Sequence, residues 1–423
     1  MDNLILGAGM AGFGASCALD HRARIFEAGS VHGGLCGTFK VSAERGDFLF
    51  DTAVHLSFAD QPLVRKIFDK VPQYRHNPQP WNFHNGIWIR HPVINNLYAL
   101  PVNERVKCIR SFLERPRDKI SSNYKEWNIE KYGYYIYENF AQKYGTKYWC
   151  CDLAELGTDW IGNRLYQPTT EEVLFGAMTD DTPNCYYAQE MRYPSEGGFV
   201  SFLNECRKNA MVQYNKKAVR ISPSSKTVFF SDGTSERYEK LFSSVPLIEL
   251  ADITDDVPEE ILALSSGLNH TSMALVSFGF SRPVCMDKFW FYIYDTDIMA
   301  SRAYAPHMKS PANVPEGCSS LQFEIPFNGR YGTPPGADAA VENCIYALKK
   351  MKLASEDDII FSDHHTAKYA NIIISGDTRE RAGQIKKYFD STAIFPVGRF
   401  GEWDYLWSHQ AFESGYNRAF KNR

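Results

Sequence analysis

The first 27 residues contain the feature that most restricts the fold of this chain. A short apolar run at residues 3–6 (NLIL) leads directly into Gly7-Ala8-Gly9-Met10-Ala11-Gly12, and a helical stretch follows over residues 13–20. A second predicted strand at residues 24–27 (RIFE) ends in Glu27. This order of strand, glycine-rich turn, helix, strand and acid is typical of a Rossmann-like unit. It predicts a dinucleotide site.

Each part of this segment has a physical task. Gly7 permits the tight turn, Gly9 lets the backbone approach a pyrophosphate, and Gly12 allows the helix to pack closely on the strand. The helix N-terminus offers free N–H groups to the phosphates. Glu27 stands 20 residues after Gly7, where a carboxylate can accept both ribose hydroxyls. A glycine-rich turn without a ligand is the alternative.

A second glycine-rich loop, AGSVHGGLCGT at residues 28–38, follows Glu27 directly. A nicotinamide enzyme normally continues into a helix at this point. Flavoproteins of the glutathione-reductase and amine-oxidase kind carry a Gly-Gly loop there, against the diphosphate and the flavin. The loop therefore favours FAD as the cofactor.

Composition and charge exclude several classes of protein. Lys and Arg total 46 against 50 Asp and Glu, without a long basic block, so nucleic acid is not expected as a partner. No apolar run is long enough for a membrane span, and Met1 precedes an apolar strand without a signal-peptide pattern. The 10 Cys lack CxxC spacing, which favours reduced thiols in a cytoplasmic protein over disulfides or zinc. The cluster Asp363-His364-His365 lacks convincing partner ligands, so we expect no metal.

The remaining pattern predicts two excursions from the nucleotide fold. Residues 102–177 have helical periodicity, residues 213–246 read as hairpins around Asp232-Gly233, and strands dominate from 271 to 374. We therefore expect an α/β protein in which a Rossmann-like FAD-binding domain is interrupted by a helical domain and by an antiparallel β-sheet substrate domain. The predicted boundaries are 1–75, 178–247 and 385–423 for the FAD domain, 102–177 for the helical domain, and 76–101 with 248–384 for the β-sheet domain.

Five blocks along the chain together suggest a family. They are FLFDTAVH (48–55), WIRHPVINN (88–96), WIGNR (160–164), YPSEGG (193–198) and GRFGEWDY (398–405). In this order they resemble the UDP-galactopyranose mutase family, closest to its larger, eukaryotic-type branch. The wider group includes protoporphyrinogen-oxidase-like and amine-oxidase-like flavoproteins. The last block is the most particular to the mutases.

The resemblance implies flavin catalysis without net redox, in cell-surface polysaccharide biosynthesis. In this family N5 of reduced FAD attacks the anomeric carbon of a nucleotide sugar and expels the nucleotide diphosphate, and the sugar recloses as a furanose. The implied partners are a nucleotide-diphosphate sugar and NAD(P)H or another reductant. A homo-oligomer is compatible with the sequence.

The resemblance also implies site residues. Catalytic positions are expected at Arg399, His55 and Arg302. Substrate contacts are expected from Arg302, Tyr405, Tyr369, Arg164, Trp290, Tyr292, His91 and Asn95. Cofactor contacts are expected from Gly7, Gly9, Met10, Ala11, Gly12, Glu27, Ala28, Gly33, Gly34, Leu35, His55, Val219, Gly398 and Arg399. Solvated arginines, core aromatic rings and a structural histidine are the plain alternatives.

This sequence departs from the family where the base would bind. The family has Tyr-Pro-Phe-Gln-Asn-Asn where this chain has HPVINN at residues 91–96, and Pro-Tyr-Asn where it has Lys143-Tyr144-Gly145. We therefore expect a base other than uracil, or UDP bound through other residues. Gly-Gly-His also becomes Ala53-Val54-His55, which stiffens that loop. An oxidase or dehydrogenase of the amine-oxidase or protoporphyrinogen-oxidase type is the main alternative, and a flavin-binding protein without catalysis is another.

Overall fold

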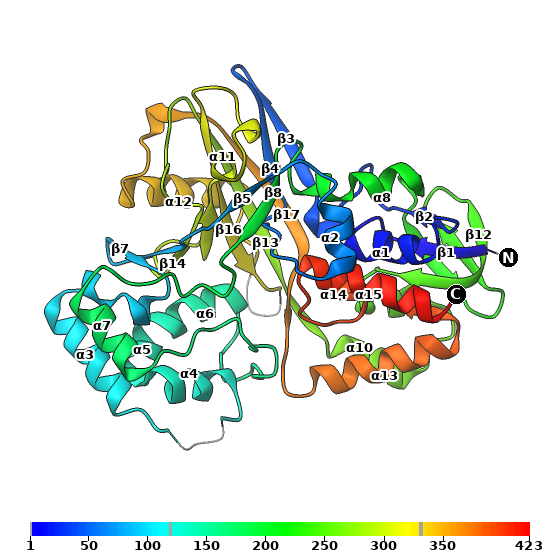
Figure 1. Ribbon diagram of the computed structural model, residues 1–423. Helices are drawn as coiled ribbons and strands as arrows, with labels where there is room; N and C mark the ends of the chain where they lie inside the picture. The colour runs from blue at the N-terminus through cyan, green and yellow to red at the C-terminus, as the bar shows by residue number, and fades with distance from the viewer. Residues whose placement is uncertain (1, 118–120, 330–332) are drawn as a thin grey trace.

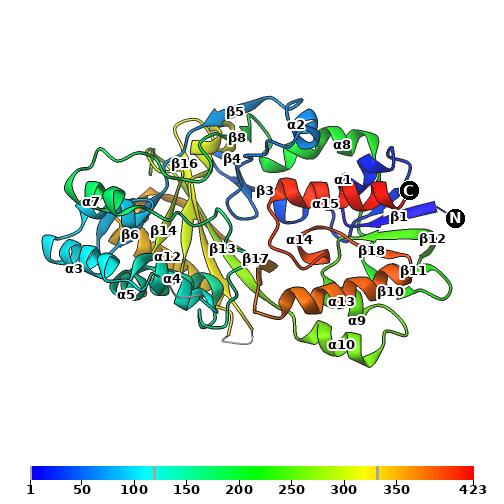
Figure 2. The same cartoon turned by 60° about the horizontal axis from the view of Figure 1, so that its bottom comes forward.

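A computed structural model describes residues 2–117, 121–329 and 333–423. The chain forms three parts that meet at the centre of the molecule: a nucleotide-fold part that contains both ends of the chain, a second large sheet, and a group of helices (Figure 1). Figure 2 shows the same three parts with the helical group and the second sheet on one side of the centre.

The nucleotide-fold part contains a parallel sheet. Its strand order is β9 (Met211–Gln213), β2 (Arg24–Phe26), β1 (Asp2–Leu6), β12 (Ser235–Ser243) and β18 (Ile394–Pro396), and every neighbouring pair is parallel. β12 also continues an antiparallel meander with β11 (Thr227–Phe230) and β10 (Ala218–Ser222). The predicted Rossmann-like unit is confirmed. β12 starts earlier than expected and ends before Pro246, which lacks the N–H of a strand residue and precedes a helix.

Helices cover this sheet on its apolar faces. α1 (Met10–Ala18) packs along α15 (Ser408–Lys421), and Phe13 and Phe412 lie in the same buried cluster. α2 (Pro62–Phe68) and α8 (Asn204–Asn209) lie at the edge of this layer. The first and last helices of the chain therefore stabilise the turn that begins α1.

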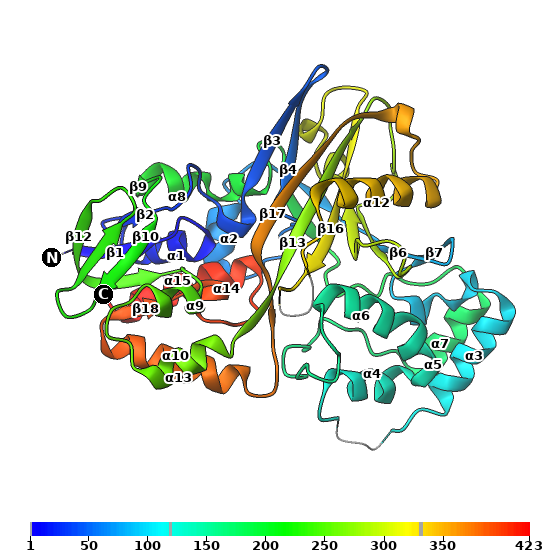
Figure 3. The same cartoon turned by 180° about the vertical axis from the view of Figure 1, so that it is seen from behind.

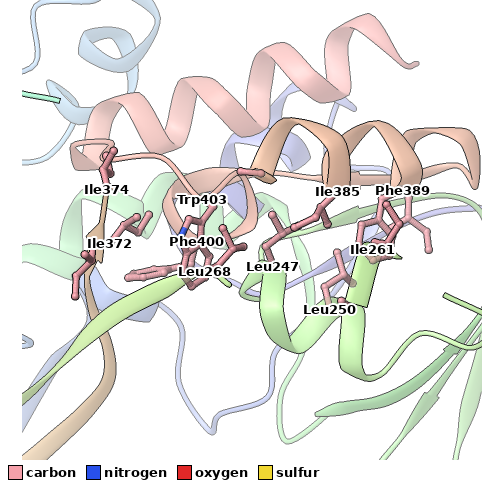
Figure 4. Packing of buried hydrophobic residues seen from close by; sticks show 14 of the residues in the cluster. Leu247, Leu250, Ile261, Leu268, Ile372, Ile374, Ile385, Phe389, Phe400 and Trp403 are labelled. Atoms are coloured by element: carbon pink, nitrogen blue, oxygen red, sulfur yellow. The ribbon is translucent and has the colours of Figure 1, made fainter. Parts of the chain in front are cut away.

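The opposite layer includes residues that the sequence pattern assigns to the β-sheet domain. α10 (Glu259–Ser266) packs on α9 (Leu247–Asp252) and on α13 (Thr378–Ser391), which also contacts β18. Figure 4 shows how Leu247, Leu250, Ile261, Ile385 and Phe389 meet in this layer. These helices thus pack with the nucleotide fold, although the sequence pattern of 248–384 is mostly that of strands. The domain boundaries stay a proposal.

The second sheet is almost entirely antiparallel. Its order is β17 (Ile359–Ile373), β13 (Asn269–Phe280), β16 (Ser319–Phe327), β15 (Arg302–Tyr304), β14 (Trp290–Ile293), β6 (Trp81–His84) and β7 (Ile87–Arg90), with only the β14–β6 pair parallel. α12 (Ala337–Lys350) covers one face, where its buried side chains join the core of the sheet. The predicted antiparallel sheet is confirmed.

The helical group consists of α3 (Val102–Leu113), α4 (Tyr124–Tyr132), α5 (Tyr134–Ile136), α6 (Gln142–Trp149) and α7 (Thr170–Met178). A π-helical turn at Tyr137–Ala141 joins α5 to α6. Side-chain caps stabilise the first turns of two of these helices. The Asn123 side chain accepts a hydrogen bond from the N–H of Glu126 at the start of α4, and Thr169 and Glu172 form a capping box at the start of α7.

Two antiparallel strand pairs connect the parts. β3 (Thr38–Ala43) pairs with β4 (Gly46–Asp51), and β5 (Gln73–His76) pairs with β8 (Met191–Pro194). Figure 3 shows β3 and β4 projecting from the nucleotide fold beside β17. The short helices α11 (Pro306–Lys309) and α14 (Gly398–Gly401) complete the junction.

Candidate active site

A cavity of about 1140 Å³ lies where the three parts meet. Its walls come from the glycine-rich loops of the nucleotide fold, from β14, β15 and β17 of the second sheet, and from α4 and α6 of the helical group. The volume is ample for a dinucleotide and a second ligand. Most of the predicted site residues line it.

The turn between β1 and α1 forms a cradle for an anionic group. Gly7 has φ of +95°, a conformation that side chains rarely adopt, and a Cβ on Gly12 would lie 1.9 Å from the carbonyl oxygen of Gly7. α1 begins after Gly9 without a side-chain cap, so its first N–H groups have no side-chain acceptor. These features fit the diphosphate of a dinucleotide.

Glu27 lines the cavity at the end of β2. Its carboxylate accepts hydrogen bonds from the N–H groups of Ala8 at 2.7 Å and Gly29 at 2.8 Å. These bonds fix the acid beside both glycine-rich loops. The position fits the expected contact with a ribose, because each carboxylate oxygen can accept more than one hydrogen bond.

Further predicted cofactor residues also line this end of the cavity: Met10, Ala11, Ala28, Gly33, Gly34, Leu35, His55, Gly398 and Arg399. Two predicted residues do not. Gly12 packs against the turn, and Val219 is 44% exposed on β10, whereas its neighbours Lys217 and Ala218 line the cavity. The structure thus places Gly12 as a packing residue. A cofactor contact by Val219 stays a prediction.

His55 faces the cavity from the loop after β4. Its Nδ1 lies 3.2 Å from the carbonyl oxygen of Ala53, and its ring lies 5.1 Å from that of Phe199. Burial lowers the pKa of His55 to about 4, against the opposing effect of Asp51. The imidazole is therefore neutral near pH 7. The N–H of the neighbouring Val54 donates to Oε1 of Glu324 at 2.8 Å.

Arg302 lies on β15 and is paired with Glu324 on β16. Nε of Arg302 is 2.7 Å from Oε2 of Glu324, a carboxylate that is completely buried. Burial opposes the charge of Arg302, but the Glu324 carboxylate raises the pKa of Arg302 well above its ordinary value. Glu324 therefore connects the predicted substrate arginine to the His55 loop. The sequence patterns did not single it out.

Tyr405 joins two of the predicted arginines. The guanidinium carbon of Arg399 lies 4.3 Å from the Tyr405 ring centre, and that of Arg164 lies 5.0 Å from it. Arg164 also donates to the carbonyl oxygen of Tyr405 at 2.7 Å. Nε of each arginine is buried and has no hydrogen-bond partner among the described residues. This cluster concentrates positive charge on the cavity.

A second tyrosine completes the cluster. The hydroxyl of Tyr148, on α6, lies 2.9 Å from that of Tyr405 and 3.3 Å from Oδ1 of Asn371. The same Asn371 oxygen accepts a hydrogen bond from Arg399 at 2.9 Å. Burial raises the pKa of Tyr148 well above its ordinary value, and Arg302 and Arg399 oppose this effect. Sequence reasoning missed Tyr148 and Asn371, which lie in segments with ordinary helix and strand patterns.

Tyr369 lies apart from this tyrosine pair. It lines the cavity, but its hydroxyl donates to Oε1 of Glu249 at 3.0 Å. Burial first, and then Glu249, raise the pKa of Tyr369. The hydroxyl that contacts Tyr405 is that of Tyr148. A substrate contact by Tyr369 stays a prediction.

Aromatic side chains surround the cavity near Arg302. Tyr292 pairs with Arg302 across β14 and β15, and Nε1 of Trp290 lies 3.3 Å from the Tyr292 hydroxyl. The His91 ring lies 4.9 Å from the Tyr292 ring. Asn95 is buried outside the cavity lining, and its side-chain oxygen has no hydrogen-bond partner among the described residues. A substrate contact by Asn95 stays a prediction.

A buried ion pair lies behind the His55 loop. Lys309 of α11 contacts Asp51 of β4, and both side chains are completely buried. Asp51 also accepts hydrogen bonds from Tyr193 at 2.8 Å and from the N–H of Phe199 at 2.9 Å. Burial raises the pKa of Asp51, but Lys309 and the N–H of Phe199 leave that pKa below its ordinary value. The pair joins the nucleotide fold to the second sheet, and the sequence patterns did not reveal it.

Residues 2–117, 121–329 and 333–423 contain no group of three or more His, Cys, Asp or Glu side chains arranged to bind a metal ion. Within the same ranges, no helix has the length and apolar character needed to cross a membrane.

Several proteins of known structure share the fold of this chain. Residues 5–71 match the family model of the NAD(P)-binding Rossmann-like domain. A crystal structure of reduced UDP-galactopyranose mutase has a TM-score of 0.92 and 21% identity, and the match covers 99% of this chain and 94% of that chain. A proposed protoporphyrinogen oxidase from Exiguobacterium sp. 255-15 has a TM-score of 0.74 and 13% identity, with 100% and 98% covered. The CLA-producing fatty acid isomerase from P. acnes has a TM-score of 0.63 and 12% identity, with 98% and 97% covered. This chain has the fold of UDP-galactopyranose mutase, so the predicted resemblance is confirmed at the level of the fold.

Proposed function

We propose that this protein is a flavin-dependent nucleotide-sugar mutase that interconverts pyranose and furanose forms. The observation that carries the proposal is the cluster of Arg164, Arg302 and Arg399 with Tyr405 on a cavity that continues to the glycine cradle. An oxidase acting on an apolar amine or a tetrapyrrole does not need such a cluster. A sugar nucleotide does, because its diphosphate carries two negative charges.

The cluster is suited to bind a diphosphate. The planar guanidinium group of arginine donates charge-assisted hydrogen bonds to phosphate oxygens. The Nε atoms of Arg164 and Arg399 have no hydrogen-bond partner among the described residues, so they can donate to such an anion. The Tyr405 ring packs against both guanidinium groups, and its hydroxyl lies 2.9 Å from that of Tyr148. These hydroxyls can donate to the same anion. Glu324 fixes the Arg302 side chain, so little conformational entropy is lost when a ligand binds.

The glycine cradle and Glu27 fit FAD, with the flavin expected near His55 and Arg399. Reduced FAD would supply the N5 nucleophile for the anomeric carbon, with no net redox change. The residues of the chain orient the sugar toward it: Arg302 and Arg399 position the diphosphate, and Trp290 and Tyr292 enclose the sugar. His55 is neutral near pH 7, so it adds no charge beside the cofactor.

The base contacts are expected to differ from those of the uridine enzymes. His91 replaces a tyrosine that stacks on uracil in the family, and Val93 and Ile94 replace the Phe-Gln pair beside it. The candidate bases are therefore uracil, thymine, guanine and cytosine. NAD(P)H or another reductant would keep the flavin reduced, and the furanose product would be a precursor for cell-surface polysaccharides.

The test uses purified protein that has been analysed for bound FAD. After reduction with dithionite, it is incubated with UDP-, dTDP-, GDP- and CDP-sugars, and pyranose and furanose forms are separated by chromatography. We expect a furanose product only with reduced flavin, and we expect Arg302→Ala to weaken ligand binding by about 1.5–3 kcal/mol. Bound FAD with oxygen consumption on amines or tetrapyrroles, and no product from any sugar, would replace the mutase with an oxidase.

A further inference from the structure

Asn82 determines which nitrogen of His91 carries the hydrogen. Asn82 lies on β6 and is completely buried. Its amide nitrogen lies 3.2 Å from the carbonyl oxygens of Ile89 and Arg90, which only accept hydrogen bonds. The amide oxygen therefore faces His91, 3.1 Å from Nδ1. Because that oxygen also only accepts, Nδ1 of His91 is the protonated nitrogen.

The second ring nitrogen of His91 is then an acceptor. Burial lowers the pKa of His91 to about 4, so the ring is neutral near pH 7 and Nε2 keeps its lone pair. His91 lines the cavity and is only half-buried. Within the described part of the chain, no hydrogen bond uses Nε2. An acceptor held in place by a buried amide is thus available to a ligand.

The position of this acceptor is close to the diphosphate cluster. The His91 ring lies 4.9 Å from that of Tyr292, and Tyr292 is directly opposite Arg302 across two paired strands. Opposite residues on paired strands have Cβ atoms about 5 Å apart. His91 is therefore separated from Arg302 by a single side chain. The sugar and the nucleoside are both attached to the diphosphate, so either of them can reach Nε2 of His91.

We propose that Nε2 of His91 accepts a hydrogen bond from an N–H or O–H group of the nucleotide sugar, with Asn82 as the residue that positions the imidazole. This inference rests on the proposed function. The donor is the imide N–H of a uracil-like base or a sugar hydroxyl. A ligand with an acceptor at that point is disfavoured, because two lone pairs would face each other.

Two variants of the FAD-loaded protein separate the acceptor from the shape of the side chain. His91→Phe keeps a ring but removes the acceptor, whereas His91→Gln keeps a donor for Asn82 and an acceptor for the ligand. We expect His91→Phe to weaken binding of UDP-galactose or of the sugar nucleotide selected in the screen about tenfold. We expect His91→Gln to bind within about threefold of wild type. FAD content and Tm show whether each variant is folded.

Two ligand pairs distinguish the source of the donor. UDP has an imide N–H that N3-methyl-UDP lacks. If the methyl compound binds more weakly than UDP to wild type, but equally well to His91→Phe, the base is the hydrogen-bond donor. An effect of His91→Phe on UDP-galactose but not on UDP assigns a sugar hydroxyl. Equal affinities of wild type and His91→Phe for every ligand would overturn the inference and leave the mutase proposal standing. Wild type that binds no sugar nucleotide would overturn both.

The tautomer can be tested without a ligand. The imidazole ¹⁵N spectrum of histidine-labelled protein should show, for the His91 signals that disappear in His91→Phe, a protonated Nδ1 and an unprotonated Nε2 at pH 7. A protonated Nε2 would contradict the inference even if His91→Phe bound weakly, because that nitrogen would then donate rather than accept.

Discussion

At the scale of single residues, the most informative side chain is one that the sequence patterns did not select. Glu324 is completely buried, pairs with Arg302, and accepts a hydrogen bond from the N–H of Val54. A buried carboxylate without partners lowers the stability of the fold. Glu324 has two partners, Arg302 and the N–H of Val54, which lie on different walls of the cavity. It therefore fixes the Arg302 side chain and the His55 loop relative to each other.

Tyr148 gives a residue-scale prediction. Its hydroxyl adjoins Tyr405 and Asn371, so Tyr148→Phe removes one hydrogen-bond donor from the diphosphate cluster while keeping the ring. A hydrogen bond to a charged group contributes about 1.5–3 kcal/mol, so we expect nucleotide-diphosphate binding to weaken about tenfold or more. Calorimetric titration on the FAD-loaded protein measures this. Tyr137→Phe, in the buried core of the helical group, is the control and should leave affinity unchanged. An unaltered Kd for Tyr148→Phe would remove that hydroxyl from the site.

At the scale of elements, a lysine of the helical group forms hydrogen bonds to the second sheet, beside the apolar contacts between the two parts. Nζ of Lys147, on α6, donates to the carbonyl oxygens of Asp295, Ile298 and Ala300 at 2.8–3.0 Å. These carbonyls belong to the loop between β14 and β15, immediately before Arg302. The same helix carries Tyr148. Lys147 thus sets the distance between the tyrosine pair and the substrate arginine.

Lys147→Met should loosen this attachment. The methionine fills similar volume but removes the lysine donor from three carbonyl groups, of which that of Asp295 keeps only the N–H of Ile298 among the described residues. This loss costs about 1–3 kcal/mol of stability. We expect faster hydrogen exchange in residues 295–301 and in α6, and weaker ligand binding, with FAD still bound. Lys143→Met, one turn earlier in α6, is the matched control. Equal exchange rates in both variants would show that the attachment does not depend on Lys147.

The turn before α1 allows a second element-scale prediction. A Cβ on Gly12 would lie 1.9 Å from the Gly7 oxygen, so Gly12→Ala must push α1 away from β1. We expect loss of FAD retention and a lower Tm. Gly383, in the middle of α13, has no atom within 4 Å of an added Cβ, so Gly383→Ala should be neutral or stabilising by up to about 1 kcal/mol. FAD retention on desalting and thermal unfolding distinguish the two. Full FAD occupancy in Gly12→Ala would contradict the close packing.

At the scale of the whole molecule, burial of neutral histidines makes stability depend on pH. Burial lowers the pKa to about 4 for five of them: His55, His84, His91, His307 and His409. Their ordinary pKa is 6.5, so between pH 6.5 and about 4 the unfolded chain binds more protons than the folded protein. The stabilisation is fully present above pH 6.5 and is lost as the pH falls toward about 4.

Denaturant unfolding of the FAD-loaded protein between pH 7 and 4.5 tests this dependence. Each neutral histidine adds a slope of about 1.4 kcal/mol per pH unit within the window. His84→Phe removes one titrating group and should make the slope shallower by that amount. A free energy of unfolding that does not change over this range would mean that the histidines become protonated in the folded protein.

The sequence by itself determined the elements and the chemistry of the nucleotide end. Hydrophobic period and glycine spacing act over a few residues, so they predicted β1, α1, β2, the hairpin around Gly233 and the cradle with Glu27. The five sequence blocks also predicted the mutase-type fold. Most of the residues that the resemblance assigned to the site line one cavity. These features depend on local backbone conformation, which a short segment specifies.

Only the tertiary structure decided which distant side chains meet. Glu324, Lys309, Tyr148 and Asn371 lie in segments whose patterns are those of ordinary strands or helices, and their importance comes from partners 22 to 258 positions away. Tyr369 was expected to contact the substrate, and its hydroxyl also donates to Glu249, a partner 120 positions away that no sequence pattern indicates. Pairing of buried charges and hydroxyls depends on three-dimensional packing, and no local pattern encodes it.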